Sequence, residues 1–274
     1  MPIIETKGLY YTYPSGTTAL QGVDLSIEEG EVIAIVGQNG SGKTTLVRQF
    51  NGLLTPTSGQ VIIGGKCTTG ITVGELSRTV GYVFQNPNHQ IFCKSVMEEL
   101  SVGPDNFGLS PEEKQKNIQR AIDLLELSSM MEKHPLMLDY TSKKILTIAS
   151  VLTFNPKVFV MDEPTGGLDE EGRKLLRRTI QCLRNEGHTV VMISHDMDFV
   201  AETMDRVVVM TKGKILQDTP VDQCFSNQEV LTAAWIEPPQ ITQLGFQLSH
   251  NHRTVLDVPS FIESYANGTL SQYI

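Results

Sequence analysis

The chain has 274 residues, of which 40% are hydrophobic and 19% are charged, and its formal net charge is −9. This length is enough for one large domain, or for one domain with an appendage, and the composition is typical of a globular protein with a core. The longest apolar runs are strand-sized and the N-terminus carries no basic and apolar leader, so we expect neither a membrane span nor a signal peptide. The acidic balance argues against nucleic acid as a partner. The four cysteines lack paired spacing, which indicates reduced thiols in a cytosolic protein.

The first third of the chain predicts strands and turns around one glycine-rich segment. Strands are expected over residues 6–13, 22–27, 31–36 and 59–64, and a helix over 45–50. Between the third strand and the helix, residues 37–44 read Gly-Gln-Asn-Gly-Ser-Gly-Lys-Thr. A short apolar strand, a glycine turn and a helix start, in this order, are the context that a phosphate-binding P-loop requires. The segment therefore predicts binding of a nucleoside triphosphate.

The residue types of this loop match the chemistry of a bound triphosphate. Glycines let backbone N–H groups approach phosphate oxygens, and the helix N-terminus adds its dipole. Lys43 is expected to reach the β- and γ-phosphates, and the Thr44 hydroxyl to ligate Mg²⁺. The alternative is a glycine-rich turn without a ligand, which the flanking strand and helix disfavour. The predicted nucleotide-binding residues of the loop are Gly37, Asn39, Gly40, Ser41, Gly42, Lys43, Thr44 and Thr45.

The rest of the chain predicts a helical stretch and then an alternation of strands and helices. Residues 95–152 are mostly helical in pattern, with a helix start where Ser110 precedes Pro111 and two glutamates. Such alternation predicts an α/β fold with a parallel sheet and crossover helices. A Glu-Pro-Pro run marks a linker, so we expect a main domain over residues 1–236 and a small appendage over 237–274. The alternating strands are expected at 158–161, 189–193 and 206–210, and the helices between them at 170–185 and 197–204.

Polar residues near predicted strand ends supply the other parts of a hydrolytic site. Asp162 can hold Mg²⁺ through water, and the adjacent Glu163 can act as a general base on the attacking water. His195 follows the next strand and is expected to hydrogen-bond the γ-phosphate, although a lone strand-end histidine is more often structural. Gln85 lies between the strand region and the helical region, where it can help to ligate Mg²⁺ and the attacking water. Tyr13 is a candidate to stack on adenine, with a core or turn aromatic as the alternative.

Taken together, these residues resemble the ATPase subunit of ABC transporters over residues 3 to about 220. The resemblance implies a P-loop NTPase core that binds ATP and Mg²⁺, an antiparallel β subdomain, and a helical subdomain over about residues 95–152. It rests on six elements in family order, namely the aromatic Tyr13, the Walker A loop 37–44, the Q-loop at Gln85, the Walker B strand with Glu163, a D-loop with Asp169, and the switch histidine His195.

Within that family the chain looks like the ATPases of energy-coupling-factor (ECF) and cobalt-type transporters, on the segments 84–92, 96–100, 103–104 and 238–244. This similarity implies a peripheral protein at the cytoplasmic face of the membrane. The implied partners are a second ABC ATPase subunit, a transmembrane coupling protein, and a substrate-binding membrane protein that captures a vitamin or a metal ion. A groove for the coupling protein is expected near Gln85, with Phe84, Phe92 and Val96 as its apolar lining or as core. The appendage is a candidate dimerisation element.

The chain departs from the family at the signature motif, Leu-Ser-Gly-Gly-Gln, which closes over the ATP of the opposite subunit. Counting back from the Walker B strand puts this motif at residues 138–142, which read Leu-Asp-Tyr-Thr-Ser. Asp139 places a carboxylate near the γ-phosphate, and Tyr140 puts a large side chain where the backbone must approach closely. Thr141 and Ser142 replace the second glycine and the glutamine. A misplaced alignment is the alternative, but no other Ser-Gly-Gly-like run occurs between residues 95 and 158.

This change affects the ATP bound by the opposite chain, because the signature motif closes over the ATP of the other subunit. The chain keeps the Walker motifs that bind its own ATP. We therefore predict a heterodimer in which the site on this chain's P-loop hydrolyses ATP and the other site is degenerate. Three alternatives stand beside it: a structural nucleotide-binding subunit with little turnover, an ABC ATPase outside the ECF group, and a soluble ABC protein of translation or DNA repair. The last would need a second ATPase half or a coiled-coil insertion. We expect His250 and His252 to be incidental rather than a metal site.

Overall fold

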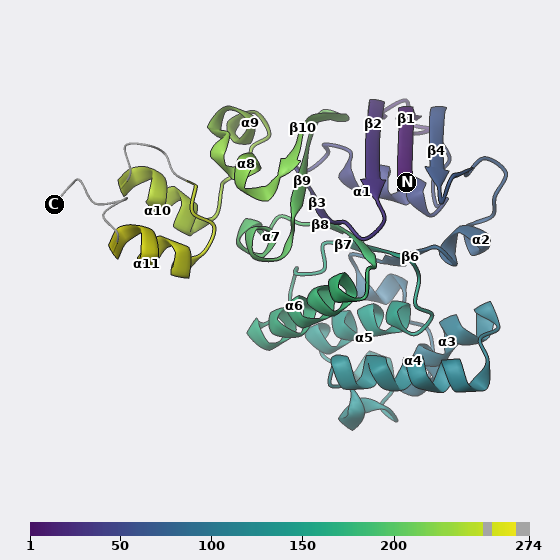
Figure 1. Cartoon of the computed structure of the whole chain (residues 1–274). Helices are drawn as coiled ribbons and strands as arrows, with labels where there is room; N and C mark the ends of the chain where they lie inside the picture. Colours follow the sequence, from purple (N-terminus) through teal and green to yellow (C-terminus); the bar gives the residue numbers. More distant parts are fainter. Residues whose placement is uncertain (249–253, 267–274) are drawn as a thin grey trace.

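Two β-sheets organise the described part of the chain, residues 1–248 and 254–266, in the computed structural model. His250 and His252 lie outside the described residues. The first sheet is antiparallel, in the order β2 (Thr18–Glu28), β1 (Pro2–Thr12), β4 (Ser58–Ile63) and β5 (Lys66–Cys67). The second has the order β10 (Lys214–Pro220), β9 (Arg206–Thr211), β3 (Val32–Val36), β8 (Thr189–Ile193), β7 (Val158–Asp162) and β6 (Val80–Val83). Its neighbouring strands are parallel except at the edge pair of β10 and β9, so the predicted α/β fold is confirmed (Figure 1).

The central strand β3 shows why an apolar run without polar alternation forms the middle of the second sheet. All five of its residues are buried, and successive side chains of a strand point to opposite faces. Ile33 and Ile35 belong to one hydrophobic core, whereas Val32, Ala34 and Val36 belong to another. A parallel strand at the centre of a sheet is covered on both faces, so both sets of side chains must be apolar.

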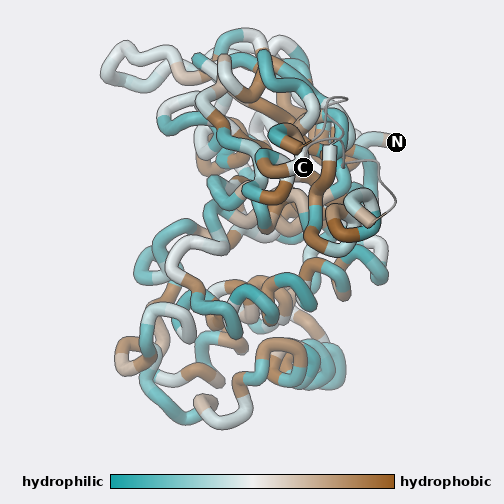
Figure 2. Tube along the Cα trace, turned by 90° about the vertical axis from the view of Figure 1, so that its left-hand side faces the viewer, coloured by the Kyte–Doolittle hydropathy of each residue, from teal (hydrophilic) through white to brown (hydrophobic). Residues whose placement is uncertain are grey.

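Helices pack on both faces of the parallel sheet. The core shared with the antiparallel sheet contains α1 (Lys43–Phe50), while the other core contains α6 (Glu170–Asn185) and α7 (Met197–Thr203). A group of three helices, α3 (Val96–Phe107), α4 (Pro111–Leu124) and α5 (Tyr140–Leu152), lies beside the sheet in the lower half of Figure 1. The short α2 (Val73–Ser77) precedes β6. Figure 2 shows hydrophobic segments inside the upper half, and helices in the lower half that alternate between hydrophobic and hydrophilic residues.

The C-terminal part is helical. It contains α8 (Val221–Ser226), α9 (Gln228–Ala233), α10 (Gln240–Leu248) and α11 (Val258–Ala266), of which α10 and α11 lie at one side of the molecule (Figure 1). The backbone N–H of Gln240 donates to Asp198 Oδ1 at 3.2 Å, so the start of α10 contacts α7. Several apolar side chains of α10 and α11 are exposed, namely Leu244, Val258, Ile262 and Tyr265. None of the helices described is both long and apolar enough to cross a bilayer.

Most expected elements are present, and the differences have local reasons. The ranges of α6 and β8 are the expected ones, and α4 begins after Ser110, whose side chain forms a reciprocal cap with Glu113. The first strand begins at Pro2 rather than at Thr6, because the residues in between are partly buried in the core. β6 and β10 were not predicted as separate strands. β6 has only four residues, and β10 alternates exposed and half-buried residues at the sheet edge.

Candidate active site

The loop between β3 and α1 has the tight glycine geometry that a phosphate cradle needs. Gly37 has a φ of 144° and Gly42 a φ of 105°, in the region that disfavours side chains. A Cβ at Gly37 would lie 2.1 Å from the carbonyl oxygen of Met210, and one at Gly42 would lie 2.6 Å from that of Ala19. Only glycine fits at these two positions, as expected for a glycine loop whose backbone approaches a phosphate.

Lys43 bends back over this loop. Its Nζ donates to the carbonyl oxygens of Gly37 at 2.7 Å and Gln38 at 3.1 Å. Burial lowers the pKa of Lys43, although the nearby carboxylates of Glu163 and Asp162 act in the opposite direction. Within the described part of the chain, the buried hydroxyl of Ser41 has no hydrogen-bond partner. A buried ammonium and a hydroxyl without a partner at a glycine turn fit a phosphate group.

The end of β7 brings a carboxylate to the start of α1. The Thr44 hydroxyl donates to Asp162 Oδ1 at 3.3 Å, and the Tyr82 hydroxyl donates to Asp162 Oδ2 at 2.9 Å. Asp162 is 1% exposed. Hydroxyl and carboxylate oxygens are the ligands that Mg²⁺ prefers, so this pair fits the ion that the sequence predicts. Sequence reasoning missed Tyr82, which reads only as a strand residue.

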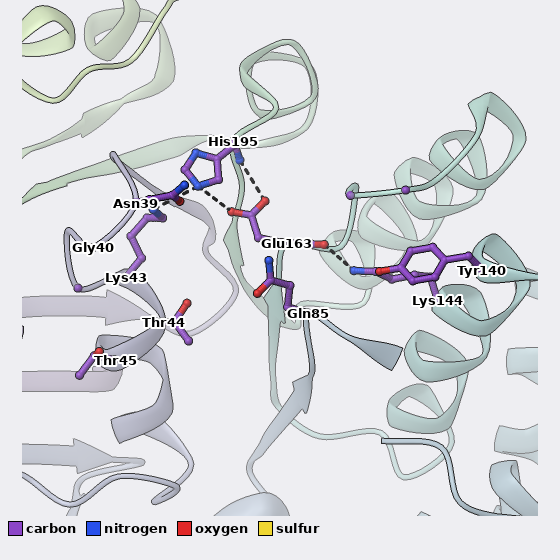
Figure 3. Close-up of a pocket in the computed structure, with 13 residues that line it drawn as sticks. Asn39, Gly40, Lys43, Thr44, Thr45, Gln85, Tyr140, Lys144, Glu163 and His195 are labelled. Carbon is purple, nitrogen blue, oxygen red and sulfur yellow. Dashed lines mark hydrogen bonds and ion pairs between the residues drawn. The ribbon is translucent and has the colours of Figure 1, made fainter. Parts of the chain in front are cut away.

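Glu163 and His195 lie against each other at the ends of neighbouring strands (Figure 3). The backbone N–H of His195 donates to Glu163 Oε2 at 3.2 Å, and His195 Nε2 is 3.4 Å from Glu163 Oε1. Burial raises the pKa of Glu163 to about 7, against the opposing effects of the His195 amide and of Lys43. Burial and Lys43 also lower the pKa of His195. A carboxyl group with a pKa near neutrality is suited to accept a proton from water.

One pocket of about 620 Å³ contains most of the predicted residues. Tyr13 lies beside it rather than in its lining, where its hydroxyl is 2.8 Å from the Thr45 hydroxyl and its ring packs edge-on against Tyr11. The roles of these residues toward ATP stay predictions. The pocket is lined by Asn39, Gly40, Gly42, Lys43, Thr44, Thr45, Gln85, Glu163 and His195, and also by Tyr140, Lys144, Gly166 and Gly167 (Figure 3).

The segment aligned with the signature motif forms the start of α5. Asp139 is the N-cap, and its carboxylate accepts from the Ser142 backbone N–H at 2.7 Å and from the Ser142 hydroxyl at 3.1 Å. The first of these bonds lowers the pKa of Asp139, which keeps it ionised. The Thr141 hydroxyl donates to the Gly167 carbonyl at 3.3 Å. The ring of Tyr140 lies against Gly167, since a Cβ there would be 2.5 Å from it.

Two further observations concern the D-loop and an unpredicted lysine. Asp169 caps α6 through the backbone N–H of Gly172, at 2.8 Å. Lys144 is 1% exposed, and its Nζ donates to the Glu163 carbonyl oxygen at 2.7 Å. Its position in the sequence gave no sign of this contact, because Lys144 lies on a helix whose partner surface is distant in the chain.

A second hollow, of about 720 Å³, lies between α2, α3 and the end of α5. Its lining includes the aromatic side chains of Phe84, Phe92, Phe107 and Phe154. Phe92 is 73% exposed, and its backbone N–H is held at 3.0 Å by the buried carboxylate of Glu99. Val96 is fully buried in the core, which is the alternative that the sequence left open for it. The hollow is therefore an aromatic groove next to the segment that contains Gln85.

Comparison with protein families and known sequences gives consistent matches. The ABC transporter family matches residues 20–166. The energy-coupling factor transporter ATP-binding protein EcfA of Methanosphaera stadtmanae is 40% identical over 252 residues, which cover 91% of this chain and 91% of that protein. Some relatives are longer, and the chain spans 45% and 42% of two of them.

Solved structures show the same similarity. The structure of cbiO1 from Clostridium perfringens, part of the ABC transporter complex cbiONQ, has 34% sequence identity and a TM-score of 0.75. The match covers 89% of this chain and 98% of that one. The ATP-binding cassette MJ0796, solved as a dimer in a post-hydrolysis state bound to ADP and Pi, has 28% identity and a TM-score of 0.72, covering 80% of this chain and 98% of that one.

Proposed function

The chain belongs to the ABC transporter family as one of its ATPases, and from this premise we propose that it powers an ECF-type importer as one half of a heterodimer. In this dimer, one ATP site is hydrolytic and the other is degenerate. The observation that carries the proposal is a contrast within the chain. Its own pocket gathers the side chains expected to bind phosphate and activate water, whereas the N-terminus of its α5 is capped by its own Asp139.

At the hydrolytic site, this chain's residues bind the phosphates and activate water. Lys43 and the backbone N–H groups of the P-loop bind the phosphate oxygens, and His195 contacts the γ-phosphate. Glu163 accepts a proton as the water oxygen bonds to the γ-phosphorus, and the bond between that phosphorus and the bridging oxygen breaks to leave ADP. Mg²⁺, which Thr44, Asp162 and Gln85 would hold, would supply positive charge that offsets the negative charge of the phosphates.

At the degenerate site, the α5 N-terminus faces the partner's ATP without the serine and glycines of the family's signature motif. A helix N-terminus attracts an anion through free N–H groups and its dipole. Here the Asp139 carboxylate already accepts the Ser142 N–H, and its negative charge opposes a γ-phosphate. The Tyr140 ring adds bulk at the next position, where it lies 46% exposed.

The aromatic groove is proposed as the contact with a transmembrane coupling protein. A groove lined by Phe84, Phe92, Phe107 and Phe154 suits the apolar face of a helix. Through this contact the chain would sit at the cytoplasmic face of the membrane. The EcfA relatives and cbiO1 favour an ECF-type complex, whose substrate-binding membrane protein would capture a vitamin or a metal ion.

The appendage over 237–274 is proposed to help dimerisation. Its helix α11 exposes Val258, Ile262 and Tyr265, which are 55%, 60% and 45% exposed. Apolar side chains at this spacing lie on one face of a helix, which burial against a second subunit would stabilise.

The heterodimer is tested by assaying ATP hydrolysis by this chain alone and with its partner ATPase subunit. We expect low turnover alone and high turnover in the complex, lost in Glu163→Gln. Strong activity of the isolated chain that Glu163→Gln abolishes would contradict the heterodimer. Turnover of the complex that Glu163→Gln leaves unchanged would mean that this chain binds ATP without hydrolysing it.

The degenerate site is tested in a Glu163→Gln background, where this chain's own ATP is not hydrolysed. The triple substitution Asp139→Ser, Tyr140→Gly and Thr141→Gly restores the family motif at those positions and keeps an N-cap residue. A rise in turnover in this background measures hydrolysis of the ATP bound by the partner, because this chain's own ATP is not hydrolysed. Unchanged turnover would show that residues 139–141 do not limit that site.

A further inference from the structure

Lys144 is a buried ammonium group next to the proposed base. It is 1% exposed, and an ammonium removed from water is destabilised unless hydrogen bonds and opposite charges compensate. Its described hydrogen bond is to the Glu163 carbonyl oxygen, at 2.7 Å. The carboxylates of Glu163 and Asp162 favour its charge, yet burial lowers the pKa of Lys144 to about 8. The hydrogen bond to Glu163 therefore offsets part of the cost of burying Lys144.

Glu163 has a backbone conformation that needs support. Its φ is 51°, in the left-handed region where a non-glycine residue is strained. Its N–H donates to the Ile193 carbonyl at 3.0 Å, and its carboxylate accepts from the His195 N–H at 3.2 Å. These contacts come from the last residue of β8 and from the segment that follows it. The Glu163 carbonyl oxygen accepts a hydrogen bond from Lys144 Nζ on α5 at 2.7 Å. It also accepts from the Gly166 N–H, at the longer distance of 3.4 Å.

The helix α5 holds the loop after β7 at two points. Tyr140 and Lys144 are four residues apart, so they lie on the same face of the helix. Tyr140 packs on Gly167 while Lys144 bonds to Glu163, and both line the nucleotide pocket (Figure 3). The loop between Glu163 and Gly167 is therefore positioned by the helix that begins at the altered signature.

We propose that Lys144 is a positioning residue for ATP hydrolysis, which holds the Glu163 peptide in the conformation that directs its carboxylate at His195 and the attacking water. The role is indirect, because the ammonium bonds to the backbone of Glu163 and not to its carboxylate. Without Lys144 the carbonyl loses its strongest donor, and the strained peptide can rotate. The inference rests on the proposed function in one respect, namely that this chain's own site hydrolyses ATP.

The test compares Lys144→Met with Lys144→Gln in the full chain assembled with its partner ATPase subunit. The two side chains are similar in size and uncharged, but only glutamine retains an N–H donor. We expect Lys144→Met to lower kcat about tenfold or more, since small misplacements of a catalytic group have effects of up to about a hundredfold. KM and the Kd for ATP should stay within about twofold, and Lys144→Gln should recover most of kcat. Lys116→Met, at an exposed lysine of α4, is the control for a lost charge.

Several results would overturn the proposal. An unchanged kcat in Lys144→Met would do so, as would an equal loss of kcat in both variants, which would make the hydrogen bond irrelevant. A raised Kd at constant kcat would make Lys144 a binding residue. If Lys144→Met does not fold, Lys144→Gln decides alone: retained kcat supports positioning, and lost kcat with an unchanged Kd contradicts it.

Two measurements separate this proposal from the proposed function. If Glu163→Gln abolishes turnover of the complex but Lys144→Met does not, only the positioning role fails. If Glu163→Gln has no effect, the proposed function fails, and a crystal structure of Lys144→Met still decides whether Lys144 holds the Glu163 peptide. In that structure the Glu163 φ should leave the left-handed region, and an unchanged φ would contradict the role of Lys144.

Discussion

Replacing Glu163 with glutamine should stabilise the nucleotide-free protein at neutral and alkaline pH, although it removes the proposed base. The Glu163 side chain is 14% exposed, and burial raises its pKa from 4.5 to about 7. The folded state therefore binds the proton of Glu163 more tightly than the unfolded chain does. Ionisation of Glu163 above about pH 7 consequently destabilises the fold, and this penalty disappears as the pH falls through 7 toward 4.5.

The size of the effect follows from the two pKa values. A tenfold change in a protonation equilibrium is about 1.4 kcal/mol, so the ionised carboxylate costs about 3 kcal/mol near pH 8. Near pH 5 the native state keeps most of its proton and about 1 kcal/mol of the penalty remains. The value of about 7 already includes the favourable charges of Lys43 and Lys144, which burial outweighs.

The measurement is urea unfolding at about pH 8 and about pH 5, without nucleotide and with a chelator to remove divalent ions. Glu163→Gln should raise the free energy of unfolding by about 3 kcal/mol at the higher pH and by about 1 kcal/mol at the lower. Glu132→Gln removes an exposed carboxylate and is the control, for which no comparable gain is expected.

Two results would refute this reasoning. A Glu163→Gln protein less stable than the wild type near pH 8 would mean that the carboxylate makes net favourable contacts. A gain of the same size at both pH values would show that the effect comes from packing and not from ionisation.

Three other substitutions test the pocket and its surroundings. Lys43→Met should weaken ATP binding at least about tenfold by calorimetry, because it removes the ammonium bent over the P-loop; an unchanged Kd would contradict its role. Tyr13→Ala should weaken ATP binding roughly tenfold and Tyr13→Phe should not, whereas equal losses would assign the effect to the hydrogen bond with Thr45 instead of stacking. Gly167→Ala should destabilise the protein by about 2 kcal/mol in thermal unfolding, because its φ is 78° and its Cβ would clash with the Tyr140 ring. Adding Tyr140→Ala should recover part of this loss, and no recovery would leave backbone strain as the sole cause.

The main parts of the pocket could be predicted because their rules are local. A glycine-rich turn between an apolar strand and a helix start specifies the P-loop at 37–44 from adjacent residues alone. The carboxyl ends of parallel strands meet at one edge of a sheet, which places Glu163 beside His195 once both strands are recognised. The strands β6 and β10 escaped prediction, since a four-residue strand and a polar edge strand have weak patterns of their own.

The sequence by itself determined the α/β class and the P-loop, and it predicted an altered signature at 138–142, because each depends on residue types and short-range spacing. Only the tertiary structure decided what the altered signature does within its own chain. There, Asp139 caps α5, Tyr140 packs on Gly167 and Lys144 bonds to the backbone of Glu163. These contacts depend on how α5 packs against the loop after β7. Hydrophobic periodicity states that a helix has a buried face, but it does not state which distant backbone atom that face will meet.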